Sequence, residues 1–160
     1  MRGEIFLRTG EEDLVEMNET QYYSEEHLQK LLAVHPKLLA GNQINPDEPR
    51  RWLLIGREVG VPDALDGNNR WSLDHLFIDQ DGVPTLVEVK RSSNTEIRRQ
   101  VVAQLLEYAA NSVLYWEIDD IIGIFKATCQ TRCTDPDTVL QHHIGCEGDA
   151  SAFWDEFSRI

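Results

Sequence analysis

The 160-residue chain has no long uninterrupted apolar run, and it is poor in cysteine and in basic residues. Without about 18 consecutive apolar residues, no membrane-spanning helix is expected. The residues after Met1 do not form the apolar core of a secretory signal. Three cysteines are an odd number without a disulfide framework, which favours a reducing, cytoplasmic location. The hydrophobic content of 41% is enough for the core of one domain.

The shortage of basic residues bears directly on function. The chain has 28 acidic residues against 15 Lys and Arg, and its formal net charge is −13. Proteins that coat nucleic acid gain affinity by neutralising phosphates with Lys and Arg, so this charge opposes that class. A metal-dependent nuclease is a partial exception, because its carboxylates gather where the cations bind. We therefore expect weak nucleic-acid affinity that depends strongly on salt and metal.

The first third of the chain predicts one helix and two strands. Ser24 is a good N-cap, the leucines that follow it have helical spacing, and Pro36 disfavours the helical conformation at the residue before it. The sequence therefore predicts a helix between these two residues. The expected strands are residues 5–7 and 52–59, and the expected loops are residues 42–50 and 60–69.

The clearest local signal is a β-hairpin whose loop is Gln80-Asp81-Gly82. The segments on either side, residues 71–79 and 85–91, are rich in β-branched and aromatic residues. A three-residue loop with Gly82 in the left-handed conformation fixes which residues of the two strands face each other. This register places Asp74 directly opposite Glu88.

Asp74, Glu88 and Lys90 form the candidate site, which we call the trio. Lys90 is two residues beyond Glu88 and projects from the same face of the strand. Two close carboxylates repel each other unless a cation compensates them, and Mg²⁺ takes one or two carboxylates together with phosphate and water. The metal can activate water, while Lys90 orients that water or stabilises the developing charge. The alternative is a solvated Glu–Lys pair, which the apolar neighbours of Glu88 oppose.

The trio and the helix after it resemble the PD-(D/E)XK, or restriction-endonuclease-like, superfamily over most of residues 22–125. In the recombination-nuclease branch of this superfamily, a Q-x-x-x-Y helix follows the E-x-K strand, and residues 104–108 (Gln-Leu-Leu-Glu-Tyr) match that pattern. Leu73 stands where the family name has proline. Pro62-Asp63 is a decoy, because it lies in a loop rich in Gly and Asn rather than on the hairpin.

The resemblance implies an α/β fold with a restriction-endonuclease-like core, in which helices flank a central mixed β-sheet. It implies a Mg²⁺- or Mn²⁺-dependent, endonuclease-like hydrolase of phosphodiester bonds, with DNA as the favoured substrate and a homodimer as a candidate assembly. The expected catalytic residues are Asp74, Glu88, Lys90 and Gln104. The alternative function is a nucleic-acid-binding or sensing module that has kept the fold but lost efficient catalysis, and the negative charge favours this alternative.

The resemblance also suggests residues around the trio. Members of the superfamily often carry an acid on the first helix, and the spacing of Glu25 with Leu28 and Leu32 places it on the inward stripe. We expect Asp74, Glu88 and Glu25 as metal ligands, although an acid in a first helical turn also stabilises the helix dipole. The expected nucleic-acid contacts are Arg91, Arg98, Arg99 and Tyr108. A solvated helix face is the alternative for Arg98 and Arg99.

We expect a nuclease-like core over residues 1–126. Within it, a helix begins at residue 94 or 95 and ends near residue 112, residues 113–116 form a further strand, and residues 119–126 form a short helix. Residues 127–160 are expected to be an irregular C-terminal extension. Similar sequences continue past a Phe-Trp segment like that at 153–154, so this extension is interpreted as the start of a second region.

The extension also contains potential zinc ligands. Cys129 and Cys133 are followed by His142, His143 and Cys146. The set Cys129, Cys133, His143 and Cys146 contains the four ligands of a tetrahedral zinc, although the second half has irregular spacing. Free thiols in a reducing compartment are the favoured interpretation.

Overall fold

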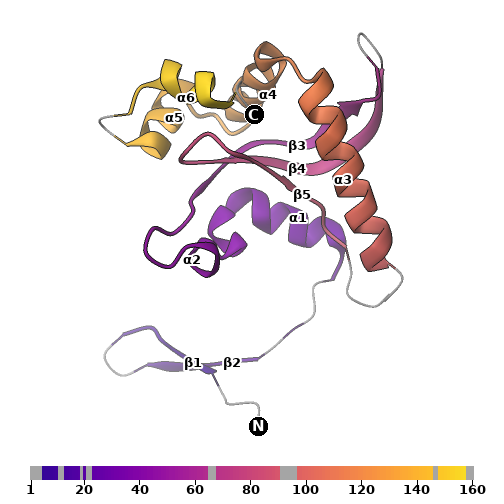
Figure 1. The fold of residues 1–160 in the computed structure, drawn as a ribbon. Coiled ribbons are helices and arrows are strands. Elements are labelled where there is room, and N and C mark those ends of the chain that lie inside the picture. Colours follow the sequence, from indigo (N-terminus) through magenta and orange to yellow (C-terminus); the bar gives the residue numbers. More distant parts are fainter. Residues whose placement is uncertain are drawn as a thin grey trace.

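A three-stranded antiparallel sheet forms the centre of the protein. The computed structural model describes residues 5–10, 13–18, 20, 23–64, 68–90, 97–145 and 148–157, with the backbone alone for residues 97 and 98. The strands β3 (Trp52–Pro62), β4 (Asn69–Asp79) and β5 (Pro84–Val87) lie in the order β3-β4-β5 (Figure 1). Helices and a sheet in one chain confirm the α/β class.

The mixed sheet that we expected is not found among the described residues, because all of their strand pairs are antiparallel. The prediction of a strand at 113–116 is wrong. Residues 113–115 are the last residues of helix α3 (Ile97–Tyr115), which continues past the expected end near residue 112. A parallel strand is joined to its sheet by a crossover connection, which is usually an α-helix. Helix α3 could serve as such a connection, but no described strand follows it.

The β4–β5 hairpin has the predicted register. Its pairs run from Ile78 with Pro84 to His75 with Val87. The N–H of Asp79 donates to the carbonyl of Val83 at 3.0 Å, so the loop has three residues. Gly82 has a φ of 81°, the left-handed conformation that the hairpin required. Both features of the predicted turn are confirmed.

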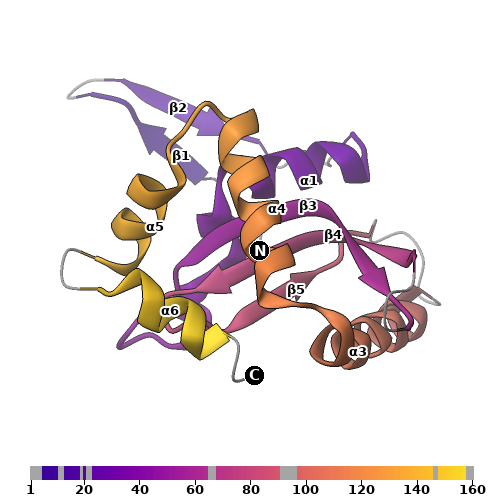
Figure 2. The same cartoon turned by 90° about the horizontal axis from the view of Figure 1, so that it is seen from above.

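Two hydrophobic clusters lie on opposite faces of the sheet. Helix α1 (Glu25–Val34) begins at the predicted cap, where the Ser24 hydroxyl accepts a hydrogen bond from the N–H of His27 at 3.1 Å. Figures 1 and 2 show α1 on one face and α4 (Ile118–Thr131) on the other. The smaller cluster is on the α1 side and consists of Leu32, Ala33, Leu54, Phe77 and Val89. The larger cluster contains Leu73, Leu76 and Ile78 from β4, together with Tyr108, Ile121 and Phe125 from the helices.

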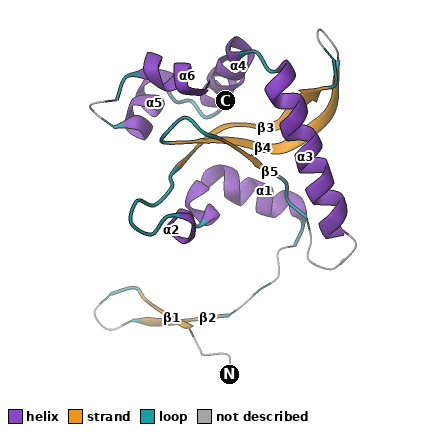
Figure 3. Ribbon diagram, viewed as in Figure 1, coloured by secondary structure: helices purple, strands orange, loops and turns teal. Residues whose placement is uncertain are grey.

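The C-terminal segment is helical, so the expectation of an irregular extension is wrong. Helix α4 extends to Thr131, and α5 (Pro136–Ile144) and α6 (Ala150–Phe157) follow it (Figure 3). Asp135 caps α5 by accepting a hydrogen bond from the N–H of Thr138 at 2.8 Å. Leu140 and Phe153 are buried in the larger cluster. Contacts with the sheet thus stabilise helices whose local sequence is rich in Thr, Asp and Gly.

The N-terminal residues form a separate hairpin, β1 (Ile5–Arg8) with β2 (Leu14–Met17), which confirms the first predicted strand. All residues of both strands are exposed, and Figure 1 shows the hairpin apart from the central sheet. Between α1 and β3, the chain forms a 3₁₀ helix at Pro36–Leu39 and the short helix α2 at Gly41–Ile44.

None of the helices that the structure describes combines the length and apolarity needed to cross a membrane.

Candidate metal and nucleic-acid site

Asp74 and Glu88 meet where the regular β4–β5 pairing ends. The last pair is His75 with Val87, so the next step of the same register places Asp74 opposite Glu88. One oxygen of Asp74, Oδ2, accepts a hydrogen bond from the N–H of Val89 at 2.7 Å. This bond fixes the backbone beyond the end of β5. The two carboxylates are therefore held at one end of the hairpin by backbone geometry.

Glu88 is the buried member of the trio, and its side chain is 2% exposed. Its Oε1 atom lies 2.7 Å from Lys90 Nζ and accepts a hydrogen bond from Gln104 Nε2 at 3.2 Å. Its Oε2 atom is buried and has no hydrogen-bond partner among the described residues. A buried carboxylate oxygen without a donor or a cation is energetically costly. This oxygen is the position in the site that most requires a positive partner.

Lys90 completes the trio with a charge that its neighbours stabilise. Burial alone would lower the pKa of Lys90, but the hydrogen bond and charge of Glu88 outweigh it and raise that pKa above its ordinary value. The charges of Asp74 and Glu25 act in the same direction. Lys90 is therefore an ammonium at neutral pH. The influence of Glu25, which is in the first turn of α1, places its carboxylate within electrostatic range of the trio.

Helix α3 supports Glu88 from the side, as the Q-x-x-x-Y spacing predicts. Gln104 Nε2 donates to the hydroxyl of Tyr108 at 2.6 Å as well as to Glu88. Tyr108 is 3% exposed, and its ring centroid lies 6.0 Å from that of Trp71. A ring this deeply buried is not available for stacking on a base, so the prediction that Tyr108 contacts nucleic acid gains no support from its position. Its hydroxyl instead helps to orient Gln104.

The strand that carries Asp74 is irregular at this position. Leu73 and Leu76 are three residues apart, yet both pack into the larger cluster, so the strict alternation of faces is interrupted between them. On β3, Glu58 lies between the pairs Arg57–His75 and Val59–Leu73 and has a φ of 52°. The pairing register is the same on both sides of Glu58, so Glu58 stands opposite Asp74 in the β3–β4 ladder. A left-handed conformation is uncommon for a residue other than glycine and is often found near functional sites.

The predicted basic patch is not assembled by the described residues. Arg91 and the side chain of Arg98 lie outside them. Arg99 is exposed on α3, where it lines a shallow pocket with Val102, Ala103 and Leu106 rather than the trio. Of the predicted basic contacts, Arg99 alone can therefore be placed, and it lies in apolar surroundings.

Two metal sites were considered from the sequence, one at the trio with Glu25 and one at the cysteines and histidines of the C-terminal segment. Within the described part of the chain, no three His, Cys, Asp or Glu side chains are close enough together to hold a metal ion. Glu25 therefore does not form a three-carboxylate group with Asp74 and Glu88. Cys129 is buried in α4 and Cys133 is exposed, and with His143 they do not form a zinc site. Cys146 lies outside the described residues.

His75 is a buried polar residue that the sequence did not single out. It is fully buried beside Asp74, its ring is stacked on Phe77, and its Nε2 lies 2.8 Å from the carbonyl oxygen of Gln29. Its Nδ1 is buried and has no partner among the described residues. Burial lowers the pKa of His75, which favours the neutral ring. A histidine in an otherwise apolar strand was the signal that would have identified it.

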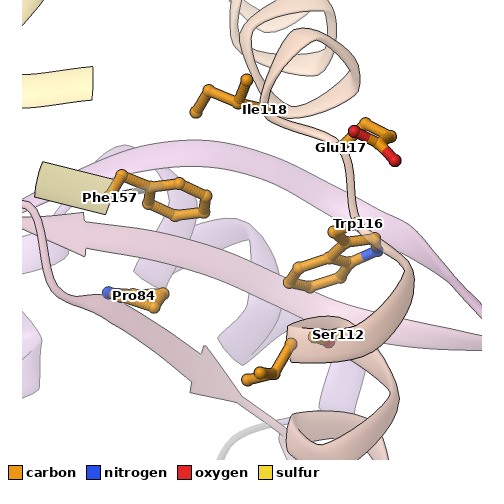
Figure 4. Close-up of a pocket in the computed structure, with 7 residues that line it drawn as sticks. Pro84, Ser112, Trp116, Glu117, Ile118 and Phe157 are labelled. Carbon is orange, nitrogen blue, oxygen red and sulfur yellow. The ribbon is translucent and has the colours of Figure 1, made fainter. Parts of the chain in front are cut away.

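A pocket of about 220 Å³ lies away from the trio, where the α3–α4 junction meets β5 and α6 (Figure 4). Figure 4 shows the rings of Trp116, Phe157 and Pro84 around it. The Ser112 hydroxyl donates to the carbonyl of Tyr108, and Trp116 Nε1 donates to the carbonyl of Gly60. These two polar groups are bonded within the protein, and the pocket's charged lining residue is the exposed Glu117 (Figure 4).

Comparison of the chain with protein-family models, with curated proteins and with solved structures gave no match. The contacts of the trio are thus the observations from which a function is inferred.

Proposed function

We propose that this protein is a divalent-metal-dependent nuclease of the PD-(D/E)XK type, which hydrolyses phosphodiester bonds of DNA with Asp74, Glu88 and Lys90. The observation that carries the proposal is the buried, unpartnered Oε2 of Glu88. A nearby cation would compensate this oxygen, because Lys90 and Gln104 both contact Oε1 and leave the buried Oε2 without a partner among the described residues. The second carboxylate, Asp74, lies one hairpin register step away.

The donor set fits a magnesium or manganese ion. Asp74 uses Oδ2 to accept the N–H of Val89, which leaves its second oxygen for a ligand role. Mg²⁺ commonly takes only one or two protein carboxylates and completes its shell with water and phosphate, so the pair suffices. When bound, the cation supplies Lewis acidity and an activated water. The negative charge of Glu25 contributes to the raised pKa of Lys90.

Lys90 has the role of a charge stabiliser. Its raised pKa keeps it protonated at neutral pH, so it donates hydrogen bonds rather than accepting protons. An ammonium beside the scissile phosphate stabilises the negative charge that develops there. Gln104 holds Glu88 Oε1 in place, and the buried hydroxyl of Tyr108 positions Gln104. Cleavage of both strands of a duplex would require a second centre, which a homodimer would supply.

A second candidate function is a nucleic-acid-binding or sensing module with the same fold. The net charge of −13 favours it, because that charge opposes tight contact with a phosphate backbone. The ion pair between Lys90 and Glu88 also favours it, since it neutralises one oxygen of the proposed ligand. The two candidates differ in a single property, which is turnover.

The test is cleavage of labelled single- and double-stranded DNA in Mg²⁺ or Mn²⁺. We expect Glu88→Gln and Lys90→Ala to lower the rate at least about 100-fold, because each removes charge from the reacting centre. Glu107→Gln and Lys126→Ala are matched controls, since both residues are exposed and outside the site. Their rates should equal that of the wild type. Equal rates for Glu88→Gln and the wild type would rule out this centre.

Metal-dependent melting tests the proposed metal site independently of turnover. Mg²⁺ or Mn²⁺ that binds the native state should raise the melting midpoint of the wild type, and Asp74→Asn should remove the rise. A rise together with DNA binding but without cleavage supports the binding module. No rise and no cleavage with either metal contradicts the proposed metal site.

A further inference from the structure

A pocket between α1 and α4 has a charge opposite to that of the protein as a whole. Its volume is about 360 Å³, within the range of small-ligand sites. Its charged lining residues are Lys30, Arg57 and Arg132, and none of the described acidic residues lines it. Three positive side chains around one cavity are unexpected in a chain with a net charge of −13. We call this cavity the α1–α4 pocket.

The two arginines of the α1–α4 pocket are anchored by uncharged acceptors, and the exposed carboxylate of Glu26 is an electrostatic partner of Arg57. One terminal nitrogen of Arg132, Nη2, donates to the carbonyl of Ala33 at 2.6 Å, and Nη2 of Arg57 donates to Gln29 Oε1 at 3.1 Å. Neither arginine forms an ion pair with a carboxylate of the described residues. The Nε atom of Arg57 is buried and lacks an acceptor in the described part of the chain. Because a guanidinium has five N–H groups, most of the donors remain available.

Lys30 adds a third positive charge at the rim of the pocket. It forms an ion pair with Glu26 at 2.7 Å, but both side chains are more than 60% exposed, so water screens the pair. The hydroxyls of Thr128 and Thr131 donate to the carbonyls of Ile55 and Ala127. These threonines therefore add no free donor, and the donors come from the three basic side chains.

This donor set suits an anion with several oxygens. Guanidinium groups bind phosphate and carboxylate through paired N–H donors, and such charge-assisted bonds are about twice as strong as neutral ones. A carboxylate offers only two oxygens, whereas a phosphate group can satisfy two guanidinium groups and an ammonium at once. We propose that the α1–α4 pocket binds a phosphate group.

The position of the pocket relates it to the trio, an argument that rests on the proposed nuclease function. Arg57, which lines the pocket, is paired across the β3–β4 ladder with His75, the neighbour of Asp74 in sequence. Directly paired Cα atoms of antiparallel strands are about 4.5–5.5 Å apart. A nucleic-acid strand has a backbone phosphate about every 3.4 Å, so a strand at the trio has further phosphates within a few nucleotides. The pocket can therefore hold a backbone phosphate near the bond that is cut.

The direct test is titration with inorganic phosphate at constant ionic strength, with sodium chloride as the reference salt and the melting midpoint and calorimetry as readouts. We expect Arg57→Gln and Arg132→Gln each to weaken phosphate binding about tenfold, the loss of one charge-assisted contact. Arg70→Gln is the matched control, because Arg70 is exposed and pairs with Asp63 outside the pocket. Lys30→Gln changes an exposed residue, so it tests the pocket even where the arginine variants fold poorly. No binding beyond the chloride reference, or equal binding by all variants, would falsify the proposal.

A short single-stranded oligonucleotide, used in a chelating buffer without divalent metal, identifies the source of the phosphate. If Arg132→Gln weakens oligonucleotide binding and inorganic phosphate competes with it, the pocket holds a backbone phosphate. If inorganic phosphate binds but oligonucleotide affinity is the same in Arg132→Gln and the wild type, the pocket takes a small phosphate compound. That second result overturns the connection to DNA and leaves the phosphate site intact. Failure of the trio is read separately, from the cleavage rates of Glu88→Gln.

Discussion

The protein contains two β-hairpins, and only one of them is part of a core. In the β1–β2 hairpin every strand residue is exposed, including Phe6 at 50%. In the β4–β5 hairpin, Leu76 and Ile78 are completely buried in the larger cluster, and Phe77 is completely buried in the smaller one. Both hairpins have regular antiparallel pairing. Pairing alone therefore does not distinguish them, but packing does.

The difference explains why the candidate site is on the second hairpin. An isolated two-stranded hairpin is marginally stable in water, and its register can slip when neither face is buried. A buried face fixes the register, because a slip of one residue would expose the whole apolar set. Asp74 and Glu88 face each other only in one register. A metal site that depends on that register requires the buried hairpin.

The largest expected effect comes from removing an aromatic side chain from each hairpin. Phe77→Ala should lower the free energy of unfolding by about 3–5 kcal/mol, since Phe77 is fully buried. Phe6→Ala should change it by less than about 0.5 kcal/mol, because Phe6 packs against little. Urea denaturation of the two variants measures both values. Similar losses in the two variants would mean that β1–β2 contributes to the core as much as β4–β5 does.

A smaller effect is expected from the glycine in each hairpin loop. Gly82→Ala should cost about 1–3 kcal/mol, because φ is 81° and a Cβ would lie 3.2 Å from the carbonyl oxygen of Phe153. Gly10→Ala should be within about 0.5 kcal/mol of the wild type, since a Cβ there meets nothing within 4 Å. Thermal melting measures both changes. A neutral Gly82→Ala would show that the loop does not depend on the left-handed residue.

A further effect is a pH dependence of stability carried by His75 of β4 and His143 of α5. Burial lowers the pKa of His75 and of His143, whose nearest backbone partner is Asp79. The unfolded state takes up these protons near pH 6.5, and the folded state takes them up only at lower pH. The stabilisation is therefore complete above pH 6.5 and is lost as the pH falls below it, by at most about 1.4 kcal/mol per pH unit and group.

Unfolding free energies measured from pH 7.5 to 5 check this dependence. His75→Gln should reduce the slope below pH 6.5, and His143→Gln should reduce it independently. If the slope is unchanged in the His75→Gln, His143→Gln double variant, other groups are responsible for the acid sensitivity.

The sequence predicted those parts of the fold whose causes are local. Ser24 capped α1 as expected, and Gly82 fixed the hairpin loop, because turns and caps depend on neighbouring residues. Residues 113–116 were misread as a strand, since their bulky apolar side chains are typical of strands. In the structure Val113 and Leu114 are exposed in the last turn of α3, and Trp116, directly after the helix, bonds from Nε1 to the carbonyl of Gly60, a partner 56 positions away that no local pattern indicates. Residues 127–150 were misread for the same reason.

The parts of the site with local causes were predicted, and the parts that depend on distant contacts were not. Strand register brought Asp74, Glu88 and Lys90 together in the prediction, and the family resemblance added Gln104. In the structure Lys90 and Gln104 contact Glu88, and Asp74 is one register step beyond the last β4–β5 pair. The α1–α4 pocket was not predicted, because its residues come from α1, β3 and α4. No local pattern relates Arg132 to Ala33, which are 99 positions apart and meet only after the sheet has formed.

The hydrogen bond between Arg132 and Ala33 also has a consequence for the order of assembly. Contacts between residues far apart in sequence form late, because the intervening chain must first be closed into a loop. The bonds that join Glu88, Gln104 and Tyr108 lie within residues 88–108, but the larger cluster that buries β4 also takes side chains from α4, α5 and α6. The α1–α4 pocket needs the end of α4 as well. Both the trio and the pocket are therefore complete only after the C-terminal helices have packed onto the sheet.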